Sequence, residues 1–118
     1  QRVTAAKWYG DFLEPFQVDV KLKGKRQELW VGEKRIEALH VPGHSPGSLV
    51  YVTESDGLKI LFGQDVHGPL DASLLSNRED YCRSLKLLLS LEADVLCEGH
   101  YGVIRGKEEV ADFIESFL

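Results

Sequence analysis

The stretch Leu39-His40-Val41-Pro42-Gly43-His44-Ser45-Pro46-Gly47-Ser48 lies near the middle of this 118-residue chain. It joins an apolar segment, residues 35–41, to a turn that contains two Pro-Gly pairs. The first part predicts a strand and the second a tight turn. His44 is carried on that turn. Because sheets usually present functional groups on the loops at their strand ends, we expect His44 to be a functional residue.

Two later segments repeat this construction. Residues 60–62 run into Gly63-Gln64-Asp65, and residues 95–97 run into Glu98-Gly99-His100. Two imidazoles and a carboxylate are a mixed nitrogen and oxygen set that suits Zn²⁺, Fe or Mn²⁺. Taken alone, each of these residue types more often has a structural role. A loop histidine usually has its hydrogen bonds satisfied within the protein, and an aspartate after a strand usually caps a turn. Their shared placement favours His44, Asp65 and His100 as joint metal ligands.

Three other residues near these turns are weaker candidates. His40 precedes the first turn, where it either supports a metal ligand or packs in the core rather than binding metal itself. His67 either lines a substrate pocket or caps the turn at residues 68–69. Tyr101 either donates to a substrate or packs beside the turn.

The surrounding pattern predicts an α/β (α+β) domain. Strict alternation over residues 17–23 predicts a half-buried strand, which would begin a three-stranded meander. Predicted strands cover residues 17–23, 29–31, 35–41, 48–53, 58–62 and 94–97. Ser76 and Glu79 match a capping box that would begin an amphipathic helix ending near Leu91. A second amphipathic helix is expected from about residue 107, and residues 1–16 are expected to be weakly helical.

The composition is that of an ordinary globular domain, with 43% hydrophobic and 28% charged residues. Methionine is absent and Gln1 is the first residue, so we expect the chain to be part of a longer protein. At this length one hydrophobic core is expected rather than two.

Charge and cysteine content exclude several classes of protein. The net charge of −5 provides no basic surface for nucleic acid, and no apolar run is long enough to span a membrane. The two cysteines have no zinc-type spacing. We therefore expect a cytoplasmic chain with free thiols and no nucleic-acid or membrane partner.

The three turns together resemble motifs of the metallo-β-lactamase superfamily. Residues 39–48 are similar to its Pro-Gly-His-Ser/Thr-Pro-Gly-Ser turn, residues 60–65 to the segment carrying its metal-bridging aspartate, and residues 98–100 to its final Gly-His. The resemblance implies an αββα sandwich in which residues 17–118 form the C-terminal half, a mostly antiparallel or mixed sheet with two amphipathic helices. Residues 1–16 would be a connecting segment.

One part of the family pattern does not occur here. The His-x-His-x-Asp-His signature precedes the other motifs in the family, whereas the four histidines of this chain begin at position 40 and are never two apart. The resemblance then implies that His44, Asp65 and His100 are three ligands of a two-metal site. Two divalent metals, Zn²⁺ or alternatively Fe or Mn²⁺, would be bound by the intact protein, and each would keep two ligands from this chain.

The function implied by the resemblance is hydrolysis of a small-molecule ester, thioester, lactone, lactam or phosphoester by a metal-activated hydroxide. The 118-residue chain alone is expected to bind Zn²⁺ weakly and to be inactive. Two alternatives stay open: an iron-dependent dioxygenase or di-iron redox protein, and a non-catalytic structural or assembly fragment. The expected macromolecular partner is the N-terminal half of the same domain or another copy of the chain.

Overall fold

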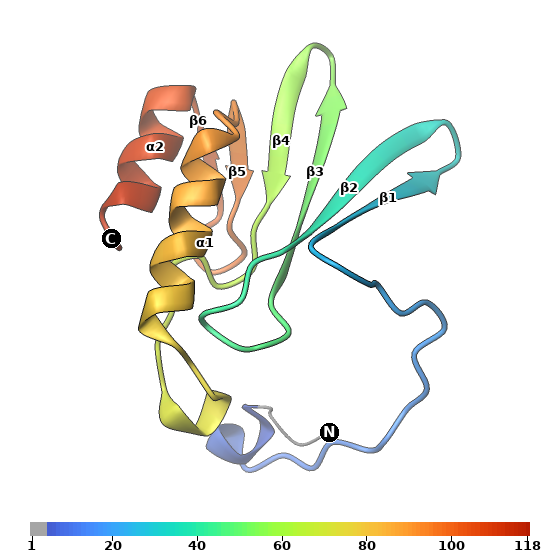
Figure 1. The fold of residues 1–118 in the computed structure, drawn as a ribbon, viewed down its shortest axis with the longest axis vertical. Helices are drawn as coiled ribbons and strands as arrows, with labels where there is room; N and C mark the ends of the chain where they lie inside the picture. Colours follow the sequence, from blue (N-terminus) through green and yellow to red (C-terminus); the bar gives the residue numbers. More distant parts are fainter. Residues whose placement is uncertain (1–4) are drawn as a thin grey trace.

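A computed structural model describes residues 5–118 as one six-stranded sheet with two α-helices (Figure 1). The strands are β1 (Arg26–Val31), β2 (Lys34–His40), β3 (Leu49–Ser55), β4 (Leu58–Phe62), β5 (Val95–Cys97) and β6 (Val103–Arg105). The helices are η1 (Ala6–Tyr9), η2 (Ala72–Leu74), α1 (Arg78–Ser90) and α2 (Lys107–Glu115), of which η1 and η2 are short 3₁₀ helices. The sheet and the two amphipathic helices confirm the expected α+β class.

The strands follow one another across the sheet in sequence order. All neighbours are antiparallel except β4 and β5, which are parallel and are joined through α1. Because β2 and β4 both flank β3 in antiparallel fashion, β2, β4 and β5 run in the same direction. The loops that follow these three strands therefore emerge at the same edge of the sheet.

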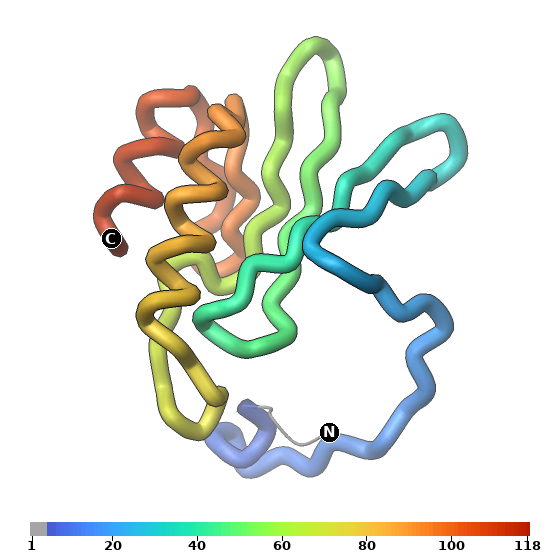
Figure 2. Tube along the Cα trace, in the orientation of Figure 1, coloured from blue at the N-terminus to red at the C-terminus, as the bar shows by residue number. Residues whose placement is uncertain are grey.

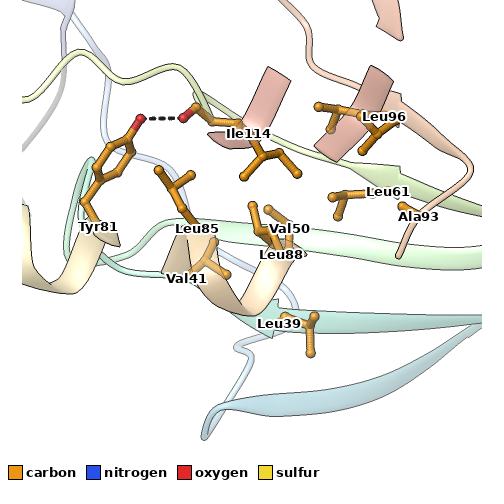
Figure 3. Close-up of a cluster of buried hydrophobic side chains, with 12 residues drawn as sticks. Leu39, Val41, Val50, Leu61, Tyr81, Leu85, Leu88, Ala93, Leu96 and Ile114 are labelled. Carbon is orange, nitrogen blue, oxygen red and sulfur yellow. Dashed lines mark hydrogen bonds between the residues drawn. The ribbon is translucent and has the colours of Figure 1, made fainter. Parts of the chain in front are cut away.

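The core lies between the sheet and the two helices (Figure 3). One row of directly paired residues, Val52, Leu61, Leu96 and Ile104, crosses the sheet on the helix-covered face. Against it pack buried side chains of the helices, among them Leu85, Leu88, Val110 and Ile114. Burying such a side chain contributes about 1.5–3 kcal/mol, so this layer dominates the stability of the fold.

The opposite face of the sheet is not covered by a helix (Figure 1). The adjacent row of paired residues, Tyr51, Phe62, Cys97 and Val103, lies on this face. Phe62 is 45% exposed and Val103 54% exposed. We call these four residues the open row. An apolar row of this kind is normally covered by another layer in a two-layer or three-layer fold.

The strand expected at residues 17–23 is wrong. This segment has no strand in the structure and belongs to the long loop that leads from η1 to β1 (Figure 2). Val18 and Val20 are 50% and 63% exposed, although both line a cavity beside the open row. Alternation predicts which side chains share a face of a strand. A strand also needs a neighbouring strand to hydrogen-bond its backbone, and residues 17–23 do not add one to the sheet, because β1 is its edge. Of the three-stranded meander expected over residues 17–41, only the hairpin of β1 and β2 is present.

Three smaller expectations also differ from the structure. Asn77, not Ser76, caps α1, since its side chain accepts from the backbone N–H of Asp80. The Ser76 hydroxyl instead donates to the His44 carbonyl. The short strand β6 was not expected at all. Of the weakly helical segment, only η1 is helical among residues 5–16, and residues 1–4 lie outside the described part of the chain. Within residues 5–118, no helix is long and apolar enough to cross a membrane.

Candidate metal centre

The loop between β2 and β3 carries His44 and is fastened to the start of α1. The Pro42 carbonyl accepts from the Ser84 hydroxyl at 2.7 Å, and the Gly43 carbonyl accepts from the Asn77 N–H at 2.8 Å. The Ser76 hydroxyl donates to the His44 carbonyl at 2.5 Å. Since three consecutive carbonyls are hydrogen-bonded by residues 76–84, the position of the His44 backbone is set by these long-range hydrogen bonds and not by the loop alone.

The loop after β4 carries Asp65 in a left-handed backbone conformation, with φ of 49°. This conformation is uncommon outside glycine and costs roughly 1 kcal/mol, although aspartate tolerates it better than most residues. The next residue, Val66, is buried, and its carbonyl accepts from the Tyr81 hydroxyl at 2.6 Å (Figure 3). Burial raises the pKa of Tyr81 to about 12, so this hydroxyl stays a donor at neutral pH.

Asp65 contacts both candidate histidines. Its Oδ2 lies 3.3 Å from Nε2 of His44, and its Oδ1 lies 2.9 Å from Nε2 of His100. The three residues come from the loops after β2, β4 and β5. The structure thus brings together the three side chains that the sequence singled out, with the carboxylate between the two imidazoles.

The orientation of His44 suits a metal ligand. Its Nδ1 lies 2.7 Å from the Pro69 carbonyl, which can only accept, so Nδ1 carries the proton and Nε2 faces Asp65. A backbone carbonyl is a common partner for the second nitrogen of a metal-binding histidine. In a neutral His44 the Nε2 lone pair would face a carboxylate oxygen of Asp65, and the two would repel each other. A cation bound between them, or a second ring proton, would remove this repulsion.

The spacing of one donor pair, His44 and Asp65, is also compatible with a shared metal. Two atoms that each lie about 2.1 Å from one tetrahedral cation stand roughly 3.4 Å apart, and His44 Nε2 and Asp65 Oδ2 are 3.3 Å apart. The set is nevertheless incomplete: within residues 5–118, no group of three or more His, Cys, Asp or Glu side chains could hold a metal ion by itself. The chemistry of the donors fits divalent metals, and the number of donors fits part of a site.

A cavity of about 580 Å³ opens beside the three residues. It is lined by His44, Asp65, His67 and His100 together with Gln64, Ser45, Pro69, Leu74, Ala5, Trp8 and Tyr9. Trp8 and Tyr9 of η1 therefore line the same cavity as the candidate metal ligands. Polar donors on one side and aromatic or aliphatic walls on the other are typical of a small-molecule site.

His40 and Tyr101 take up different positions. The Nε2 of His40 lies 2.7 Å from the carbonyl of Pro46 and so supports the His44 loop, while the ring lines a separate cavity next to Tyr51. Tyr101 is 61% exposed and is not among the residues that line the site cavity. Its ring packs edge-on against His67, with centroids 5.1 Å apart.

Glu98 is the residue that the sequence reasoning missed. It lies in the third motif, where the sequence pattern assigns it no role, yet it is only 1% exposed. Burial raises its pKa, but hydrogen bonds from the His67 ring and from the amides of Tyr101 and His67 together lower the pKa by more. Glu98 is therefore a buried carboxylate. A charged residue between a buried strand and Gly99 was the available signal, because glutamate is rarely fully buried unless it is paired.

The mixed sheet with helices on one face matches part of the metallo-β-lactamase fold. No protein-family profile and no curated protein sequence matches the chain. Solved structures do match, among them several metallo-β-lactamase superfamily proteins. The resemblance expected from the motifs is confirmed at the level of the fold.

Three of these structures illustrate the extent of the match. A superfamily protein from Sulfolobus tokodaii aligns with 92% of this chain and 43% of its own, at 18% identity and a TM-score of 0.66. A family protein from Thermus thermophilus aligns with 86% of this chain and 36% of its own, at 25% identity and a TM-score of 0.65. A metallo-β-lactamase from Cronobacter sakazakii covers 87% of this chain and 48% of its own, at 19% identity and a TM-score of 0.64. The chain therefore spans less than half the length of each.

Proposed function

We propose that this chain contributes part of the active site of a metal-dependent hydrolase, with His44, Asp65 and His100 as metal ligands. The observation that carries the proposal is the contact of Asp65 with both imidazole Nε2 atoms. The fold supports it, because structural neighbours such as the Cronobacter sakazakii protein are named as metallo-β-lactamases. The substrate would be a small molecule with an ester, thioester, lactone, lactam or phosphoester bond.

Each residue has a defined part in this proposal. His44 offers Nε2 because the Pro69 carbonyl holds the proton on Nδ1. Asp65 offers one oxygen toward each histidine, so that it would bridge two cations. When bound, divalent cations lower the pKa of water and stabilise negative charge on a substrate oxygen. The cavity beside these residues would seat the substrate, with the η1 aromatic side chains as its far wall.

Metal analysis tests the proposal. The 118-residue chain is incubated with Zn²⁺, dialysed, and analysed for Zn, Fe and Mn, and its ester hydrolysis is measured in parallel. We expect weak Zn²⁺ binding that dialysis reverses, and no hydrolysis, because each cation has only two ligands from this chain. Stoichiometric metal that survives dialysis would contradict the proposal, and so would an absence of any Zn²⁺ binding during titration.

We propose further that the open row is covered by the other half of the fold or by a second copy of the chain. The four residues of this row are apolar or weakly polar, and two of them are about half exposed. Apolar patches of this kind mark interaction surfaces. A cytoplasmic location is proposed from the two cysteines, both of which are free thiols in the structure, and cell fractionation would test it.

A further inference from the structure

Glu98 connects two loops of the candidate site. It follows β5 on the helix-covered side of the sheet, and its side chain has no exposed surface. Its Oε2 accepts from the backbone N–H groups of His100 and Tyr101, both at 3.1 Å. Its Oε1 accepts from the ring Nδ1 of His67 at 2.6 Å and from the His67 N–H at 3.3 Å. One oxygen thus holds the loop after β5 and the other holds the loop after β4.

The contact with Glu98 determines which nitrogen of His67 is a donor. An ionised carboxylate can only accept, so Nδ1 of His67 carries a ring proton and Nε2 is the ring nitrogen left for another partner. Within the described part of the chain, no group is hydrogen-bonded to this Nε2, and no polar side-chain atom is both buried and unpartnered. The Nε2 atom is therefore accessible to solvent. His67 is also one of the residues that line the site cavity.

The ring of His67 is also held mechanically. It packs edge-on against His100, Tyr101 and Phe117, with centroid separations of 5.0, 5.1 and 6.4 Å. Phe117 follows α2, so the end of the last helix contributes to this packing. A ring fixed on three sides and bonded at Nδ1 cannot turn to exchange its two nitrogens without breaking these contacts.

We propose that Glu98 is a positioning residue: it holds the Nδ1–H of the His67 ring, so that Nε2 is the ring nitrogen left for substrate, and it ties the loop of His67 to the loop of His100. That Nε2 would hydrogen-bond a polar group of the substrate close to the reacting bond. That last step rests on the proposed hydrolase function, whereas the tautomer and the loop connection do not. A buried carboxylate that only stabilised the fold would not need to set the tautomer of a ring in the cavity.

The wild-type chain without metal provides the first test. Long-range ¹H–¹⁵N NMR spectra identify which ring nitrogen of each histidine is protonated. We expect a proton on Nδ1 of His67. A neutral His67 ring with its proton on Nε2, or a mixture of the two tautomers, would overturn the proposal. This measurement needs no variant and decides the question even if Glu98 variants do not fold.

The Glu98→Gln variant provides the second test, with Glu79→Gln as control. Glu79 is an exposed residue of α1 whose side chain makes only a surface ion pair. In Glu98→Gln we expect mixed His67 tautomers and at least about tenfold faster hydrogen exchange at the amides of His100 and Tyr101. We also expect Zn²⁺ affinity to fall about tenfold, the size typical of residues that orient metal ligands. Glu79→Gln should leave all three unchanged.

The outcomes separate the two proposals. A Glu98→Gln chain with an unchanged tautomer and unchanged exchange would overturn the positioning role. If instead the wild-type chain has the expected tautomer but Zn²⁺ does not bind on titration, the positioning role is supported and the hydrolase proposal is contradicted.

Discussion

Gly43 packs directly against the backbone of Tyr81 at the first turns of α1. A β-carbon at position 43 would lie 2.3 Å from the Cα of Tyr81, and Gly43 has a φ of 146°, a conformation that other residues rarely adopt. The motif loop can approach the helix this closely only because residue 43 has no side chain. The approach also keeps the loop beside the start of α1, where Asn77 and Ser84 donate to the carbonyls of Gly43 and Pro42.

We expect Gly43→Ala to destabilise the chain by about 3 kcal/mol, since it combines overpacking with backbone strain. Gly47→Ala in the same loop is the control, because a β-carbon there would meet no atom within 4 Å. Urea unfolding followed by circular dichroism measures both. Equal stability of the two variants would show that the close approach has no energetic importance.

Tyr81→Phe should lower the free energy of unfolding by about 1–3 kcal/mol, because the buried Val66 carbonyl would lose its hydrogen-bond donor. Urea unfolding of the variant and the wild type measures this loss.

The pH dependence of the wild type is a separate prediction. The folded pKa of Tyr81 is raised to about 12 from 10.0, so its contribution is fully present below pH 10 and is lost as pH rises toward 12. The loss should reach on the order of 2 kcal/mol. Alkaline denaturation of both proteins measures it, and Tyr81→Phe should lack this part of the pH dependence.

Asp65→Asn should weaken Zn²⁺ binding at least about tenfold, since it removes the negative charge between the two histidines. Asp56→Asn is a matched control: Asp56 has a similar φ of 51° but lies in the β3–β4 turn, away from the site. Isothermal titration with Zn²⁺ compares the two. If both variants bind as the wild type does, Asp65 is not a ligand.

Phe62→Lys should reduce self-association of the chain, because a charge at the centre of the open row disfavours its burial against another copy. Leu87→Lys, on the exposed side of α1, is the control. Light scattering with size-exclusion chromatography gives the mass of each variant. Should the wild type and Phe62→Lys have the same mass at every concentration, the open row does not bind a second copy.

Much of the architecture could be predicted from local patterns. The strand at Leu58–Phe62 agrees with the structure, as does the second amphipathic helix expected from about residue 107, in which Val110 and Ile114 are buried. Each depends on a short-range rule, an apolar run or helical spacing. Residues 17–23 obey the alternation rule for strands and still form no strand, because pairing depends on a neighbour that local sequence does not specify.

The site shows the same division. The types and order of His44, Asp65 and His100 were readable from the motifs, since strand ends, glycines and ligand chemistry are all local properties. Their contact was not readable. It depends on β2, β4 and β5 running in one direction, which is a property of the whole sheet.

By itself, the sequence determined which residues have side chains of a metal-binding type and that each follows a strand, because side-chain type and periodicity are local properties of the chain. Only the tertiary structure decided that Asp65 lies between the two histidines and that Glu98 is buried beneath them. The physical reason is that burial and hydrogen-bond partners arise from residues far apart in sequence. Glu98 meets His67 across 31 positions, and no local pattern predicts that contact.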